Sequence, residues 1–148
     1  MEQKTFPFVY NDGGRSSAEY KGETGDCVVR AIAIVSGVNY QSVYDRINEL
    51  AQRERITRRK RTRSNARSGV HKNTYNKYLS ELGFKWVSCM GIGTGCKVHL
   101  RTSEMPSEGK YIVRVSKHLT SLVEGTLQDT FDCSRGGNRC VYGYFVKN

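Results

Sequence analysis

The stretch "KGETGDCVVRAIAIVSG", residues 21–37, decides the fold prediction, because a polar loop changes there into an apolar segment of helical length. Residues 28–36 are nearly all apolar, which predicts a helix that is buried on most of its sides. Gly37 ends this helix, as glycine commonly does at a helix C-terminus. Cys27 stands at the point of change, so a thiol is expected at the start of the first buried helix.

A helix start is a place where a cysteine can become reactive. Thr24 or Asp26 is suited to cap this helix, which leaves Cys27 in its first turn. Unpaired N–H groups and the positive end of the helix dipole stabilise a thiolate there. The same N–H groups can donate hydrogen bonds to an oxyanion that forms on an attacked carbonyl. Most cysteines in small domains are buried and inert, so Cys27 still needs a base to be a convincing nucleophile.

The rest of the chain predicts two more helices and then strands. Asn39 is suited to cap a second helix, in which apolar side chains recur on one face. A third helix is predicted within residues 73–84, with Gly83 as its stop. From Lys85 onward the sequence changes to short β-rich runs separated by Gly, Pro and Ser. These runs cover residues 85–90, 110–116, 118–125, 126–132 and 140–146.

The order of these elements predicts an α+β fold, with N-terminal helices packed on a C-terminal antiparallel β-sheet. A chain of 148 residues suits one domain, which we place at residues 1–148. No run of 18 apolar residues exists and the N-terminus does not read as a signal peptide, so neither a membrane span nor export is expected. The five cysteines are then expected to be free thiols in the reducing cytoplasm.

The net charge of +10 is concentrated in one segment. Residues 53–72 contain nine Lys and Arg and one Glu, for a net charge of +8, whereas the other 128 residues carry +2. The segment has no apolar periodicity, so we expect a mobile loop or frayed helix, a basic insertion in a nearly neutral domain. A solvated loop without a partner is the simpler interpretation, and contact with nucleic acid or an acidic protein is the alternative. The candidate contact residues are Arg58, Arg59, Lys60, Arg61 and Arg63.

A catalytic cysteine needs a base, and the chain offers three histidines. His71 lies in the basic segment, where a solvated surface position is expected. His99 alternates with apolar neighbours, as a strand residue that faces water does. His118 begins the run "HLTSLVEGTLQDTFD", which reads as a β-hairpin. His118 is therefore the candidate whose surroundings can be predicted.

The hairpin places a carboxylate beside His118. With residues 124–125 at the turn, Thr120 faces Asp129 across the two strands. Side chains alternate between the faces of a sheet, so His118 and Asp129 share one face as diagonal neighbours. Asp132 falls on the opposite face. A carboxylate in this place fixes the tautomer of the imidazole and stabilises the imidazolium formed during proton transfer.

The order of these residues resembles that of papain-like cysteine peptidases: a Cys that starts the first long helix, a His at a strand start, and an Asp on the next strand. The closest resemblance is to short forms, such as the peptidase domains of bacteriocin-processing transporters. Over about residues 20–146, it is the order of the predicted helices and strands that is similar. The segments "NDGGR", "TGDCVVRAIAI" and "HLTSLVEGTLQDTFD" also look like those of small proteins often met in phage genomes, which implies a host cytoplasm. The papain-like resemblance implies that Cys27 is the nucleophile, His118 the general base and then acid, and Asp129 the orienting residue.

One position departs from the family's pattern. These peptidases usually carry a Gln six residues before the cysteine, whose amide completes the oxyanion hole, and Lys21 stands there in this chain. Lys21, Asn11 of the "YNDGGR" turn, or backbone N–H groups are the candidate donors in its place, and Asp26 is a further cleft candidate. Removal of one oxyanion donor typically slows a reaction by about 10²–10³-fold, so the departure weakens an enzyme without excluding one.

The cysteine spacing raises a metal site as an alternative. Cys89 and Cys96 are seven residues apart, as are Cys133 and Cys140. Paired ligands of structural zinc usually stand about two to four residues apart, so buried thiols are the simpler interpretation. The sequence predicts no metal and no cofactor.

These observations favour a cysteine-dependent hydrolase that acts on a peptide or another amide bond, with a peptide or protein as substrate. Two alternatives stay open. The same triad can perform deamidation or acyl transfer, because a thioester intermediate does not dictate the acceptor. The chain can instead be a binding module for nucleic acid or an acidic partner through residues 53–72.

Replacement of Arg58, Arg59, Lys60 and Arg61 with Ser tests the basic segment. We expect the free energy of unfolding to change by less than about 0.5 kcal/mol, because exposed substitutions away from special features do little. If the segment binds duplex DNA, each lost phosphate contact should flatten the log–log salt slope of binding by about 0.9. Thermal unfolding and binding across a salt series measure both effects. A wild-type protein that binds no nucleic acid at low salt would remove this class of partner.

Overall fold

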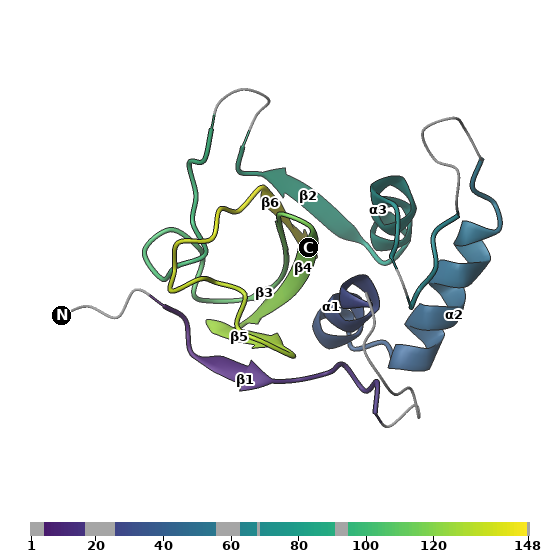
Figure 1. Ribbon diagram of the computed structural model, residues 1–148, viewed down its shortest axis with the longest axis horizontal. Coiled ribbons are helices and arrows are strands. Elements are labelled where there is room, and N and C mark those ends of the chain that lie inside the picture. Colours follow the sequence, from purple (N-terminus) through teal and green to yellow (C-terminus); the bar gives the residue numbers. More distant parts are fainter. Residues whose placement is uncertain (1–4, 17–25, 56–62, 68, 91–94, 148) are drawn as a thin grey trace.

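The computed structural model describes residues 5–16, 26–55, 63–67, 69–90 and 95–147 (Figure 1). The described chain forms three helices and one six-stranded sheet, so the α+β class is confirmed. The helices are α1 (Cys27–Ser36), α2 (Tyr40–Ala51) and α3 (Lys72–Glu81). The strands are β1 (Phe8–Tyr10), β2 (Phe84–Ser88), β3 (Lys110–Val115), β4 (His118–Val123), β5 (Thr126–Asp129) and β6 (Gly143–Lys147).

The sheet is mixed, with the strand order β1-β5-β4-β3-β6-β2. Strand β1 pairs with β5 in parallel, and the other neighbours pair antiparallel. The expectation of an antiparallel sheet is therefore wrong at this edge. Strand β1 is only three residues long, too short for an alternation of apolar and polar side chains to mark it as a strand.

The hairpin of β4 and β5 has the predicted register. Ser121 lies opposite Gln128, and Leu122 lies opposite Leu127. With this register, His118 at the start of β4 and Asp129 at the end of β5 lie at the same end of the hairpin. This is the end that lies near the start of α1.

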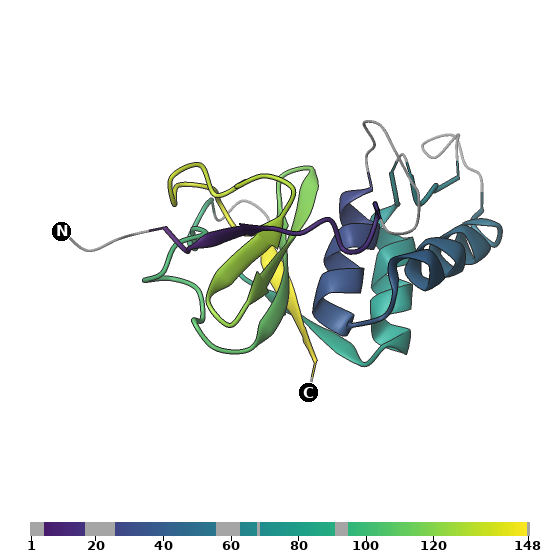
Figure 2. The same cartoon turned by 90° about the horizontal axis from the view of Figure 1, so that it is seen from below.

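The three helices lie together at one end of the molecule, and the strands lie at the other (Figures 1 and 2). Helix α1 lies between the sheet and the other two helices, and contacts β4 more than any other strand. Its buried side chains, such as Ile32, join Ile112, Leu119 and Phe145 of the strands in one apolar cluster. A second apolar cluster contains strand side chains such as Val113. It also contains side chains from the loop segments that come before β3 and after β5 in the chain.

The end of α1 and the start of α2 have the predicted caps, whereas Asp26 does not cap the start of α1 with its side chain. Gly37 adopts a left-handed conformation after α1, and its N–H donates to the Ala33 carbonyl at 3.1 Å. The side chain of Asn39 accepts a hydrogen bond from the Ser42 N–H at 2.8 Å at the start of α2. These local signals therefore fix where α1 ends and α2 begins.

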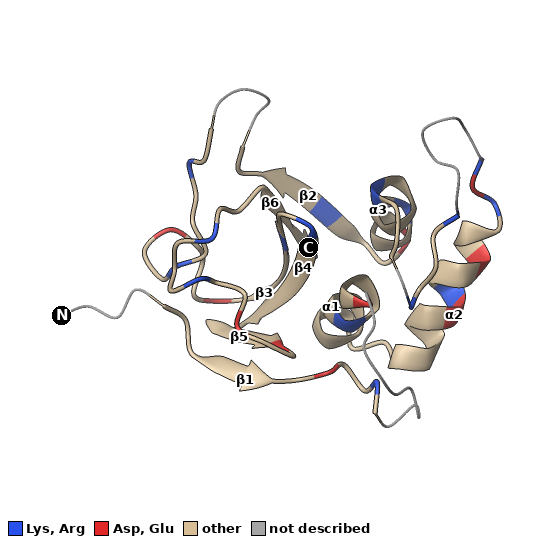
Figure 3. Ribbon diagram, in the orientation of Figure 1, with Lys and Arg blue, Asp and Glu red and all other residues tan. Residues whose placement is uncertain are grey.

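The basic segment differs from the expectation, because its described part contributes to the core. Ala66 is fully buried in the first cluster, and its N–H donates to Asn48 of α2 at 2.9 Å. The carboxylate of Glu54 accepts from the Ser64 N–H at 2.5 Å. Burial raises the pKa of Glu54, but hydrogen bonds from Ser64 and Thr74 outweigh it, so this pKa lies below its usual value. Figure 3 shows acidic and basic residues alternating along α2 and the chain that follows it.

Two of the five cysteines are joined. Cys96 and Cys140 form a disulfide with their Cα atoms 5.8 Å apart, so the expectation of five free thiols is wrong for this pair. Cys27, Cys89 and Cys133 are free. No helix in the described residues is long and apolar enough to cross a membrane.

The "NDGGR" segment forms a tight turn that packs against α1. The Asn11 side chain accepts from the Gly13 N–H at 2.8 Å, and the Asp12 carboxylate accepts from the Gly14 N–H at 3.0 Å. Gly13 has a φ of +70°, and a Cβ placed on it would lie 3.1 Å from the Arg30 carbonyl oxygen. Glycine is therefore required both by the backbone conformation and by the close approach to α1.

The packing of this turn can be tested with Gly13→Ala and a matched control, Gly136→Ala. Gly136 has a φ of +66° and nothing within 4 Å of the added Cβ, so its variant reports the left-handed strain alone. That strain costs about 1–2 kcal/mol. We expect Gly13→Ala to lower the free energy of unfolding by at least about 1 kcal/mol more, because backbone atoms must move. Chemical denaturation measures both, and equal losses would contradict close packing of the turn on α1.

Candidate functional site

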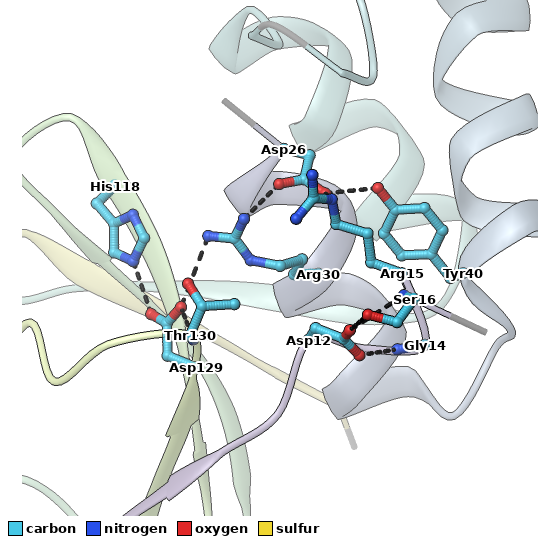
Figure 4. A network of polar contacts seen from close by, with 10 residues as sticks. All are labelled: Asp12, Gly14, Arg15, Ser16, Asp26, Arg30, Tyr40, His118, Asp129 and Thr130. Atoms are coloured by element: carbon cyan, nitrogen blue, oxygen red, sulfur yellow. Dashed lines mark hydrogen bonds and ion pairs between the residues drawn. The ribbon is translucent and has the colours of Figure 1, made fainter. Parts of the chain in front are cut away.

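The candidate site forms where the start of α1, the start of β4 and the end of β5 meet. His118 Nε2 lies 2.7 Å from Asp129 Oδ2, which is the contact that the hairpin register predicted (Figure 4). The Thr120 hydroxyl donates to the same carboxylate oxygen at 2.7 Å, and the Thr130 N–H donates to Asp129 Oδ1 at 2.7 Å. Asp129 is 4% exposed, so this carboxylate is held by several donors inside the protein.

Cys27 and His118 line the same cavity, and His118 acts directly on the pKa of the thiol, so the three predicted triad residues come together. Burial raises the pKa of the thiol, whereas the hydrogen bond and the charge of His118 lower it. The Leu119 backbone and the charge of Arg30 lower it further, and the pKa of Cys27 lies below its ordinary value. The thiolate is therefore favoured by neighbours that belong to the same site.

The electrostatics of His118 complement those of the thiol. Burial lowers the pKa of His118, but hydrogen bonds to Asp129, Cys133 and Cys27 raise it to about 11. Burial raises the pKa of Asp129, yet the hydrogen bond and the charge of His118 hold it below its usual value. At neutral pH the pair is therefore an imidazolium beside a carboxylate.

A buried charge network joins this pair to the start of α1 (Figure 4). The guanidinium of Arg30 pairs with Asp26, and its other end lies 3.6 Å from Asp129. Asp26 is fully buried, accepts a hydrogen bond from the Tyr40 hydroxyl and lies 3.5 Å from the Arg15 guanidinium. These partners occupy the Asp26 carboxylate, which makes no capping hydrogen bond to the helix.

The consequence is an uncapped helix start beside the thiol. No acidic side chain lies in the first turn of α1, and its N-cap carboxylate is turned to other partners. The first amides of a helix have no acceptor within the helix, and the helix dipole is positive at this end. The start of α1 therefore suits an anion, either the Cys27 thiolate or an oxyanion.

Of the other oxyanion candidates, Asn11 and Asp26 have different partners in the described residues. Lys21 lies outside the described residues. The Asn11 amide donates to Gln128 at 2.8 Å, and Asn11 is not among the residues that line the cavity beside Cys27. Asp26 serves as the buried partner of Arg30. The backbone amides of α1 are therefore the donors that the geometry favours.

Cys27 and His118 open onto a cavity of about 420 Å³. This volume falls in the range of sites that take a side chain or a small ligand. Its wall combines α1, the β3–β4 hairpin, α3 and residues at the end of the basic segment. The lining residues are Cys27, Val28, Arg30, Gly69, Val70, Tyr75, Arg114, Val115, Lys117, His118, Leu119 and Phe131. Of the candidate nucleic-acid contacts, Arg63 is exposed, and Arg58, Arg59, Lys60 and Arg61 lie outside the described residues.

Two residues of the site were missed by the sequence analysis. Arg30 carries the one charge inside an apolar helix, and that isolation was a signal of a buried ion pair. Cys133 is 2% exposed, and its sulfur lies within 4.8 Å of a ring nitrogen of His118, so a second sulfur lies beside the predicted catalytic base. Cys133 follows the last residue of the hairpin in an irregular loop, where no periodicity predicts its direction.

His118, Asp129 and Cys133 are also the residues that could hold a metal ion. Their donor atoms, one nitrogen, one oxygen and one sulfur, lie within 4.8 Å of one another. This donor set suits zinc, but a metal ligand must be deprotonated. The raised pKa of His118 opposes metal binding at neutral pH, because the ring must first lose its proton.

Comparisons of the chain with models of known protein families, with curated proteins and with solved structures find no match. The function is therefore inferred from the geometry and the charges of the site.

The lowered pKa predicts that iodoacetamide alkylates Cys27 at about pH 6–7, well before Cys89 and Cys133. Cys89 is the internal control, because burial raises its pKa. His118→Ala should move the alkylation of Cys27 to a pH about one unit higher or more, because the main charge that stabilises the thiolate is lost. Peptide mass spectrometry across pH 5–10 measures each thiol. Simultaneous labelling of the three thiols, or a pH dependence that His118→Ala leaves unchanged, would count against an activated Cys27.

Proposed function

We propose that this protein is a papain-like, cysteine-dependent hydrolase that cleaves a peptide or another amide bond. The observation that carries the proposal is the placement of Cys27 and His118 on one cavity, with His118 Nε2 held by Asp129 at 2.7 Å. The position of Cys27 at the first residue of α1, beside β4, is the arrangement that a papain-like fold would use. The opposite pKa shifts of Cys27 and His118 favour a thiolate and an imidazolium at neutral pH.

The first half of the reaction forms an acyl-enzyme. The Cys27 thiolate attacks the carbonyl carbon, a C–S bond forms, and the carbonyl electron pair moves onto the oxygen. The first amides of α1 stabilise this oxyanion. As the tetrahedral intermediate collapses, the C–N bond breaks and His118 gives its proton to the leaving amine. A thioester and a neutral His118 remain.

The second half restores the site. Neutral His118 removes a proton from water, and the water oxygen attacks the thioester carbonyl. The C–S bond breaks, its electron pair returns to sulfur, and the carboxylic acid leaves. Cys27 is again a thiolate and His118 an imidazolium, so one water is consumed for each amide cleaved.

Asp129 holds the ring through both halves. Its carboxylate binds Nε2, which orients the imidazole so that the rest of the ring faces the thiol. Thr120 and the Thr130 N–H fix the carboxylate in turn. Deamidation and acyl transfer use the same first half, and differ only in the amine that leaves or the nucleophile that replaces water.

The decisive variants are Cys27→Ala and its matched control Cys133→Ala, which removes the other sulfur beside His118. The activity is measured as new peptide termini, detected by mass spectrometry in a pool of synthetic peptides. Cys27→Ala should lower the rate by at least about 10³-fold, because removal of a nucleophile costs most of the catalysis. Cys133→Ala should stay within about tenfold of wild type, because Cys133 takes no part in bond formation.

A chelator and an added amine separate the alternatives. Excess EDTA should leave the rate unchanged, and hydroxylamine should divert product to a hydroxamate if acyl transfer to amines competes with hydrolysis. Full activity in Cys27→Ala, or its loss in EDTA, would contradict the proposal.

A further inference from the structure

The cavity beside Cys27 carries positive charge that the described residues do not neutralise. Arg114 and Lys117 line it, and none of the twelve described lining residues is acidic. No ion pair within the described part of the chain includes either of these two side chains. Arg30, the third cation of the wall, is held by two carboxylates. Two cations therefore stay available to an anion in the cavity.

The placement of Arg114 leaves its hydrogen-bonding edge available. Its guanidinium carbon lies 5.6 Å from the centroid of the Tyr142 ring, in a cation–π contact. The described residues give the guanidinium no ion pair besides this contact, so its N–H groups can still bind a carboxylate. The Tyr142 contact thus holds the cation in position without neutralising it.

Lys117 lies in the two-residue turn between β3 and β4, directly before His118 in the chain. Its φ is +57°, a conformation that glycine, asparagine and aspartate adopt at lower cost. A lysine at this position is therefore not explained by the turn. It places a flexible cation at the wall of the cavity, next to the base.

Tyr75 of α3 adds a neutral donor. Burial raises the pKa of this phenol, the charge of Arg114 lowers it and the charge of Cys27 raises it, with a net upward shift. The hydroxyl therefore keeps its proton and lies within the influence of both the thiol and the guanidinium. No hydrogen bond joins it to another residue in the described ranges.

We propose that this cavity is a specificity pocket for an acidic side chain, Asp or Glu, adjacent to the amide that Cys27 attacks. The inference rests on the proposed hydrolase function. A carboxylate would meet Arg114, Lys117 and the Tyr75 hydroxyl, whereas a lysine side chain would meet two like charges. A volume of about 420 Å³ has room for such a side chain.

A first experiment measures the charge of the cavity without any catalysis. Iodoacetate and iodoacetamide differ by one negative charge, and both alkylate Cys27. The variants are Lys117→Asn, which suits the positive φ of the turn, and Arg114→Gln, alone and together. Lys85→Gln is the matched control, because it removes one exposed positive charge from β2, outside the cavity wall.

We expect the iodoacetate-to-iodoacetamide rate ratio at Cys27 to fall about tenfold in the double variant at low ionic strength. The ratio should stay at the wild-type value in Lys85→Gln. The fall should shrink as salt is added, because screening weakens the attraction of the charged reagent. Equal ratios in wild type and double variant would overturn the inference.

A second experiment uses three tripeptidyl acyloxymethyl ketones, with Glu, Gln or Lys next to the reactive ketone. The Glu probe should label Cys27 about tenfold faster than the Gln probe, and the Lys probe should be slowest. The double variant should lose this preference. If the probes react without a preference for Glu, the hydrolase proposal stands and the acidic pocket is wrong. If no probe reacts but the iodoacetate preference persists, the hydrolase proposal fails and the positively charged cavity remains.

Discussion

The buried guanidinium of Arg30 is the constraint on which the candidate site depends. A buried charge costs several kcal/mol unless it is paired, so the chain must bring carboxylates to it. Asp26 and Asp129 fill that role, one at the start of α1 and one at the end of β5. Asp26 directly precedes Cys27, and Asp129 binds His118. Arg30 therefore links the helix that carries the thiol to the hairpin that carries the base.

The same network keeps the start of α1 open to an anion. An N-cap aspartate ordinarily turns its carboxylate to the first amides of its helix. Here Arg30 and the Tyr40 hydroxyl hold that carboxylate instead. Burial and Asp26 together raise the pKa of Tyr40, so the phenol keeps the proton it donates. The first amides of α1, which a capping carboxylate would otherwise bind, can therefore stabilise the thiolate or an oxyanion.

The parts of the structure that the sequence predicted are those set by local rules. The apolar run 28–36 and Gly37 predicted α1, and the turn of the hairpin predicted that His118 lies beside Asp129. Strand β1 was missed because it is only three residues long and pairs with a strand more than a hundred residues later. Ala66 and Cys133 both lie in irregular loops. Such loops have no repeating pattern of side-chain directions, so neither the burial of Ala66 nor the approach of Cys133 to His118 could be predicted.

Charge divides the site into two layers. In the inner layer, Asp26 and Asp129 face Arg30, Arg15 and His118, so each carboxylate has a cationic partner. In the outer layer, the cavity presents cations with no acidic lining residue in the described chain. In the proposed reaction, the thiolate is the anion beside this cavity before acylation, and the acylated sulfur is uncharged. A carboxylate on the substrate would keep the charges of the cavity matched through that step, which a neutral substrate could not do.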